Sequence, residues 1–97
     1  FTVIHTPGHT PGHISLLHRK ARLLIAGDVL TNRRGTLRGP APAFTPEMEA
    51  AKRSIWRLAK QYGDDYETIA FGHGPPVLTN GGKRVRALAS QMMSEQI

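Results

Sequence analysis

The sequence predicts an α/β fold in which two helices cover one face of a β-sheet. Short apolar runs end in glycine or polar residues, and two later segments repeat their apolar residues at helical spacing. Along the chain the order is strand, strand, strand, helix, strand, helix. The second face of such a sheet needs a covering layer, which this order does not supply. We therefore expect the 97 residues to be one part of a larger domain.

Three strands are expected in the first third of the chain. Residues 1–5 form a short apolar run, and residues 14–18 and 23–26 form two more, joined by a tight polar connection. Between the first two runs lies TPGHTPGH, residues 6–13, whose two Pro-Gly pairs interrupt any regular element. This segment is predicted to be a loop with a stiff backbone.

The rest of the chain predicts a long loop, a helix, a strand and a second helix. Residues 31–44 are rich in Gly, Pro, Arg and Thr, which favours a surface loop. Thr45 is the expected N-cap of the first helix, with Pro46 in its first turn. A strand is expected over residues 67–71 and a helix from Asn80. The buried helix faces are predicted to hold Met48, Ala51, Ile55, Leu58, Ala59 and Tyr62, and then Val85, Leu88, Ala89 and Met92.

Composition excludes some kinds of site and leaves others open. There are no cysteines, which excludes disulfides and thiolate metal sites and is compatible with a cytoplasmic location. No apolar run approaches the length of a membrane span, so no membrane partner is expected. The formal net charge of +6 admits an anionic partner. The basic residues are dispersed and no aromatic residues interleave with them, so the pattern does not favour nucleic acid.

His9, Asp28 and His73 are the candidate site residues. Pro-Gly pairs on both sides of His9 suit a rigid ligand loop, although a loop histidine is more often a surface residue. Asp28 and His73 each follow an apolar strand that ends in glycine. Asp28 would either cap the next turn or face a metal ion or a catalytic water. From the residues alone, a metal site and a structural role remain equally open.

Three segments together resemble motifs of the metallo-β-lactamase superfamily. HTPGHTPGH at 5–13, LLIAGDVL at 23–30 and IAFGHGPP at 69–76 have the order and separation of its third, fourth and fifth motifs. FTPEMEAAKRSIWRLA at 44–59 looks like the helix that follows the substrate loop in bacterial members. The resemblance covers nearly the whole chain. It implies the C-terminal half of an αββα sandwich, with a mixed sheet covered by two helices.

The resemblance also implies a two-metal site. His9 would bind the first metal ion, His73 the second, and Asp28 would bridge both and serve as the catalytic residue. The implied chemistry uses a hydroxide shared by the two ions. Zinc is the expected metal for His and Asp ligands, and iron or manganese suit the same donors. His13 is expected to be structural or to support a ligand, and His18 to lie on the surface.

One motif of the family is absent from the chain. The first metal-binding motif, His-x-His-x-Asp-His, lies in the N-terminal half of family members, so the chain alone is expected to be inactive. The missing half is the expected partner, with a second copy of the chain as another. The full-length protein would hydrolyse a small ester, thioester or lactone. A phosphodiesterase or nuclease of the same fold and a non-catalytic binding module are the alternatives.

Overall fold

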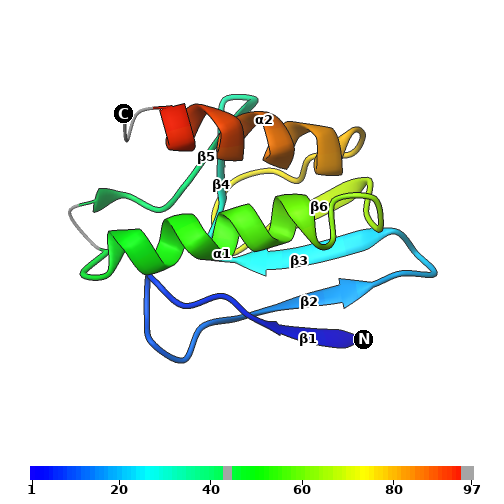
Figure 1. Cartoon of the computed structure of the whole chain (residues 1–97). Helices are drawn as coiled ribbons and strands as arrows, with labels where there is room; N and C mark the ends of the chain where they lie inside the picture. The colour runs from blue at the N-terminus through cyan, green and yellow to red at the C-terminus, as the bar shows by residue number, and fades with distance from the viewer. Residues whose placement is uncertain (43–44, 95–97) are drawn as a thin grey trace.

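The computed structural model describes residues 1–42 and 45–94 of the chain. The elements follow in the order β1 (Thr2–His5), β2 (Ile14–His18), β3 (Leu23–Gly27), β4 (Thr31–Arg33), β5 (Thr36–Arg38), α1 (Met48–Lys60), β6 (Thr68–Phe71) and α2 (Gly81–Ser94) (Figure 1). No helix in these ranges is long and apolar enough to cross a bilayer.

The main sheet is mixed and has the strand order β1-β2-β3-β6. β1, β2 and β3 pair antiparallel, whereas β6 lies parallel to β3. The chain leaves β3, passes through the β4–β5 hairpin and α1, and returns beside β3 as β6. Parallel neighbours require a crossover of this kind, and the helix supplies it. The expected mixed sheet is confirmed.

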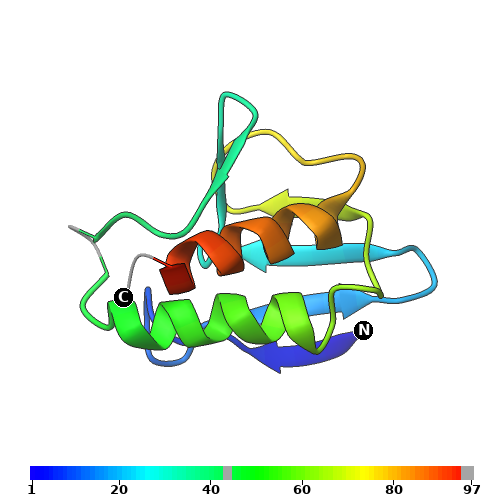
Figure 2. The ribbon, with the colours of Figure 1, turned by 45° about the horizontal axis from the view of Figure 1, so that its top comes forward.

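Both helices cover the same face of this sheet and pack against each other (Figures 1 and 2). Side chains alternate along each strand, so every second residue faces the helices. The fully buried core residues include Ile4, Leu17, Leu24, Ala26, Ile55, Leu58, Ala59, Tyr66, Ile69 and Val85. The predicted apolar faces of the two helices contribute directly to this core. Tyr66 is the largest of its side chains, and its hydroxyl donates a hydrogen bond to the Leu58 carbonyl at 2.9 Å.

The opposite face of the sheet is apolar and open. Val3, Leu16, Ile25 and Ala70 form a continuous row across the four strands. Val3 is 62% exposed, and Ile14 on the same face is 47% exposed. An exposed apolar row of this kind matches the uncovered face that the element order predicts.

The segment over residues 31–44, predicted to be a loop, is partly a β-hairpin instead. β4 and β5 pair antiparallel through a two-residue turn at Arg34 and Gly35, both with positive φ (55° and 85°). This turn geometry suits the twist of a two-residue hairpin, and glycine adopts it without strain. The hairpin was missed because its strands are polar and short. Residues 43–44 lie outside the described part of the chain.

The predicted N-cap of α1 is also wrong. The helix begins at Met48 with Glu47 as its N-cap residue, and no side chain caps it. The Thr45 hydroxyl donates instead to the Ala41 carbonyl at 2.7 Å, within the preceding loop. Pro46 lies in a turn before the helix rather than in its first turn.

Candidate metal centre

Asp28 and His73 meet because β3 and β6 run parallel and end at the same edge of the sheet. Gly27 pairs with Phe71, and the Gly72 amide donates to the Gly27 carbonyl at 3.0 Å. The residue after each glycine therefore emerges at the same level. The loop over residues 6–13 reaches this edge too, since it joins the end of β1 to the start of β2.

Each carboxylate oxygen of Asp28 faces one imidazole. His73 Nδ1 lies 3.1 Å from Asp28 Oδ1, and His9 Nε2 lies 3.9 Å from Asp28 Oδ2. The Asp28 side chain is 36% exposed, His9 is 32% exposed and His73 is 84% exposed. These distances bring the three candidate residues together at one edge of the sheet. Their metal-binding role stays a prediction.

The donor chemistry and spacing suit a metal ion, although the set is incomplete. Two atoms bound at about 2.1 Å to one tetrahedral zinc ion lie about 3.4 Å apart. The 3.9 Å between His9 and Asp28 is near this value and too long for a hydrogen bond. His9 Nδ1, the ring nitrogen that does not face Asp28, is buried without a hydrogen-bond partner in the described structure. Within residues 1–42 and 45–94, no group of three such side chains could hold a metal by itself.

Helix α1 holds the loop that carries His9. The Ser54 hydroxyl donates to the Pro7 carbonyl at 2.8 Å, and Arg57 donates to the His5 carbonyl at 3.1 Å. Across the loop, the Thr6 amide donates to the His13 carbonyl at 2.9 Å. These bonds and the two Pro-Gly pairs fix the backbone on both sides of His9. The site is therefore preorganised on its loop side.

His13 connects that loop to the backbone of Asp28 through a chain of hydrogen bonds. The Asp28 amide donates to His13 Nε2 at 2.9 Å, and His13 Nδ1 lies 2.9 Å from the Thr6 hydroxyl. That hydroxyl is 2.9 Å from the Ser15 hydroxyl, which donates to the Ala26 carbonyl. A backbone amide can only donate and a carbonyl can only accept, so the two ends of this series of hydrogen bonds fix the direction of every bond in it. His13 therefore carries its proton on Nδ1 and donates it to Thr6.

The protonation state of His13 agrees with this direction. Burial lowers the pKa of His13 below its ordinary value, which outweighs the opposing effect of the Asp28 charge. The neutral imidazole is the form that can accept from the Asp28 amide. His13 thus acts on Asp28 through the backbone amide. The sequence predicted a structural or supporting role for His13 but not this contact.

Two glycines leave room for these contacts. A Cβ on Gly72 would collide with Asp28 Oδ1, so a side chain there would displace the carboxylate. Gly27 has φ +65°, and a Cβ on it would lie 2.7 Å from His13 Nε2. The Gly-Asp and Gly-His pairs are therefore steric requirements of the site.

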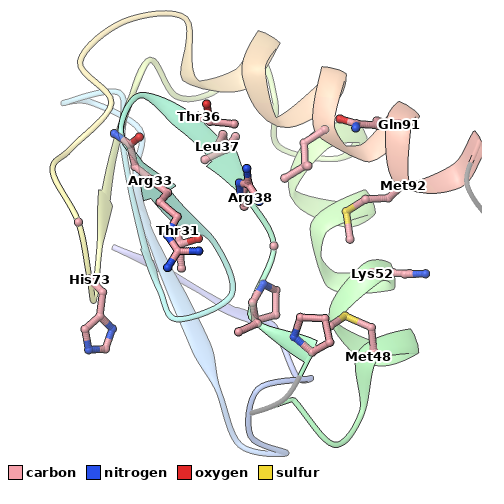
Figure 3. Close-up of a pocket in the computed structure, with 17 residues that line it drawn as sticks. Thr31, Arg33, Thr36, Leu37, Arg38, Met48, Lys52, His73, Gln91 and Met92 are labelled. Atoms are coloured by element: carbon pink, nitrogen blue, oxygen red, sulfur yellow. The ribbon is translucent and has the colours of Figure 1, made fainter.

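The β4–β5 hairpin forms one wall of a cleft beside His73. Asn32 is buried, and its side-chain amide donates to the Pro75 carbonyl at 2.9 Å, which ties β4 to the loop after β6. The cleft has a volume of about 840 Å³ and is lined by the hairpin, α1, α2 and the His73 loop. Figure 3 shows His73 at one end and Met48 and Lys52 at the other. This wall could not be predicted from the sequence, because the polar strands of the hairpin were expected to be loop.

The remaining histidines lie outside the cluster. His5 Nε2 contacts the Pro11 carbonyl at 2.8 Å, within its own loop. His18 is half-buried, its Nδ1 accepts a hydrogen bond from the Ala21 amide, and its ring packs edge-on against Phe1. In the described part of the chain, neither His5 nor His18 has a hydrogen bond or ion pair with Asp28.

The sequence and the fold of this chain are similar to those of known proteins. Residues 1–73 match the model of the metallo-beta-lactamase superfamily. The Bacillus subtilis protein described as "Probable metallo-hydrolase YflN" is 40% identical over 95 residues, covering 87% of this chain and 34% of that protein. The chain thus spans about a third of the length of this relative.

Two further comparisons agree with this family. "Hydroxyacylglutathione hydrolase GloC" of Haemophilus influenzae is 47% identical over 30 residues, which cover 31% of this chain and 14% of GloC. The crystal structure of the metallo-beta-lactamase family protein TTHA1429 from Thermus thermophilus has a TM-score of 0.67 and 26% identity. That match covers 95% of this chain and 30% of TTHA1429.

Proposed function

Because the chain belongs to the metallo-beta-lactamase superfamily, we propose that it forms part of a metal-dependent hydrolase in which His9, Asp28 and His73 bind two divalent ions. The observation that carries this proposal is the placement of one imidazole against each oxygen of the Asp28 carboxylate. A carboxylate presented in this way suits a bridging ligand. Zinc is the metal we expect, with iron or manganese as alternatives.

The residues of this chain would hold and orient the reacting centre. Bound metal ions supply Lewis acidity and an activated water at such a site. Asp28 would be the ligand that the two ions share, and His13 would fix the Asp28 backbone through the bond to its amide. We propose that the remaining ligands come from another part of a longer protein, packed on the open face of the sheet. This chain would then be inactive alone.

We propose small esters, thioesters or lactones as the substrates. The partial similarity to GloC, whose name describes a thioester hydrolase, supports this class over one short segment. A phosphodiesterase is the second candidate, because the cleft beside His73 is lined by Arg33, Arg38 and Lys52. A non-catalytic binding module is the third, although the intact cluster of His9, Asp28 and His73 argues against it.

The test is Asp28→Asn in the full-length protein. The shape of the side chain is kept while its negative charge is lost, so the fold should persist and metal binding should weaken. We expect turnover to fall on the order of a hundredfold or more, because the activated water is lost. The measurements are hydrolysis of ester, thioester, lactone and phosphodiester substrates, metal content, and thermal unfolding as the folding control.

The matched control is Asp64→Asn, which removes an exposed carboxylate paired with Arg86 at 3.0 Å. That variant should keep both activity and bound metal. Near-normal turnover and full metal content in Asp28→Asn would show that Asp28 only shapes its turn. A fully metal-loaded wild-type protein that cleaves none of the substrates would favour the binding module.

A further inference from the structure

The cleft beside the metal cluster has a basic hairpin as its wall. His73 lines one end of the cleft and contacts Asp28, so the cleft opens onto the place where the substrate would react. Arg33 and Arg38 lie between His73 and Lys52 in the view of Figure 3. None of the 17 residues that line the cleft is acidic among those the structure describes.

The pairing of β4 with β5 puts both arginines on the same side of the hairpin. Thr31 is opposite Arg38, and Arg33 is opposite Thr36, while Asn32 and Leu37 form the pair between them. Side chains alternate in a strand, so Arg33 and Arg38 share one face and Asn32 and Leu37 share the other. The second pair points inward, since Asn32 is buried and Leu37 packs against the core.

Some basic residues of the described chain pair with carboxylates, whereas Arg33 and Arg38, like Arg34 and Arg53, do not. Arg19 pairs with Asp65, Arg86 with Asp64 and Lys52 with Glu49. Over residues 1–42 and 45–94, neither Arg33 nor Arg38 makes an ion pair with a carboxylate. Like charges on diagonal positions of a hairpin face are close enough to interact unfavourably. An anion between them would offset that repulsion and accept hydrogen bonds from both guanidinium groups.

The other wall of the cleft is formed by the two helices. Met48 of α1 and Leu88 and Met92 of α2 supply its apolar surface, beside the polar side chains of Lys52 and Gln91. Flexible methionine side chains adapt to ligands of varied shape. A ligand in this cleft would thus meet guanidinium groups on one side and apolar side chains on the other.

We propose that the cleft binds an anionic ester or thioester, with its carboxylate or phosphate group on Arg33 and Arg38 and its apolar part against Met48, Leu88 and Met92. This inference rests on the proposed function and names the substrate class for the same site. In the hydrolysis, the oxygen of water joins the acyl carbon. The bond from that carbon to the leaving oxygen or sulfur breaks, and a proton goes to the alcohol or thiol.

The test compares charged and neutral substrates that are otherwise alike, using the full-length enzyme. p-Nitrophenyl succinate and p-nitrophenyl butyrate form the carboxylate pair. S-Acetyl-4′-phosphopantetheine and S-acetylpantetheine form the phosphate pair. The variant Arg33→Gln/Arg38→Gln should lower kcat/KM for the anionic substrate of at least one pair by about tenfold, mainly through KM. The neutral substrates should change by less than roughly twofold. The pair that responds identifies the anionic group.

The matched control is Arg53→Gln, which removes an exposed arginine of α1 that does not line the cleft. It should leave both substrate pairs unchanged. If glutamine at 33 and 38 lowers thermal stability, Arg33→Lys/Arg38→Lys keeps the charge and should retain most of the preference for anions. Equal losses on charged and neutral substrates, or no loss on either, would overturn the proposal.

Binding measured by calorimetry separates this inference from the proposed function. Succinate or coenzyme A should bind the wild-type protein more tightly than the double variant, even if the enzyme hydrolyses neither ester. Absence of both binding differences would overturn the anion site. If the double variant lost binding to a short single-stranded DNA while its ester kinetics were unchanged, the two arginines would bind a polyanion instead. That result would also overturn the proposal.

Discussion

At the scale of single residues, His13 is the side chain that joins the two parts of the site. It accepts a hydrogen bond from the Asp28 amide and donates one to the Thr6 hydroxyl in the preceding loop. Its position is fixed by a series of hydrogen bonds through Thr6 and Ser15 that ends on the Ala26 carbonyl of β3. The loop of His9 and the turn of Asp28 are therefore fixed relative to each other by one neutral imidazole.

We predict that His13→Ala lowers both stability and metal affinity. The Asp28 amide and the Thr6 hydroxyl would lose their partner in a part-buried place, which costs about 1–3 kcal/mol of unfolding free energy. Metal affinity of the full-length protein should fall by about 10- to 100-fold, since the ligand is no longer oriented. Chemical denaturation and metal titration measure the two effects.

The control for this prediction is His5→Ala, in the same loop. The His5 side chain is exposed and, among the described residues, bonds to the Pro11 carbonyl alone, so its loss should change stability little and leave metal affinity unaltered. Metal affinity at the wild-type level in His13→Ala would show that Asp28 needs no support from His13.

At the scale of elements, the β4–β5 hairpin shapes the space in front of the metal cluster. Its inner face is attached to the His73 loop through the bond from Asn32 to the Pro75 carbonyl. Gly74 touches Asn32 so closely that a Cβ there would collide with the Asn32 carbonyl. The hairpin and the His73 loop thus hold each other in position.

Replacing Asn32 by alanine should loosen both segments without affecting the metal ligands. One buried hydrogen bond is lost, so unfolding should become about 1–2 kcal/mol easier. Amide hydrogen exchange should increase over residues 31–38 and 72–76, and KM should rise more than kcat falls. Thr36→Ala, on the opposite face of the same hairpin, is the control for the exchange measurement and should leave the exchange rates of both segments unchanged. Unchanged exchange in Asn32→Ala would mean that packing alone holds the hairpin.

The sequence could predict the candidate site better than the wall in front of it. Asp28 and His73 follow apolar runs ending in glycine, a signal that local pattern carries. The parallel pairing of β3 with β6 depends on contacts between segments about 45 residues apart, as the Asp28–His73 bond shows, so their proximity had to be inferred. No sequence pattern predicts the bond between His13 and the Asp28 amide, because one of its partners is a backbone group. The strands of the hairpin are polar and lack the apolar alternation from which a strand is predicted.

At the scale of the whole molecule, the chain presents a sheet with one covered and one open face. The helices bury Ile4, Leu17, Leu24 and Ile69 on the covered face, whereas the row from Val3 to Ala70 is left open. The structural relative TTHA1429 aligns with 95% of this chain but only over 30% of its own length. We propose that the open face packs against a further part of the same protein.

This proposal predicts an unequal response to two lysine substitutions in the full-length protein. Val3→Lys should lower the unfolding free energy by about 2 kcal/mol or more, because the charge would enter a packed interface. Met93→Lys, at an α2 residue that is 45% exposed, should change it by less than about 0.5 kcal/mol. Thermal or denaturant unfolding gives both values. A harmless Val3→Lys would show that the face stays open in the longer protein.

The number of metal ions bound per full-length chain tests the central claim most directly. It is measured by elemental analysis of wild type, His9→Ala and His73→Ala after dialysis against a limiting metal buffer. We predict two ions in the wild type and about one in each variant, since each histidine serves a different ion. Folding of each variant is checked by its circular dichroism spectrum. A wild-type stoichiometry that neither substitution changes would contradict the assignment of this edge of the sheet as a metal centre.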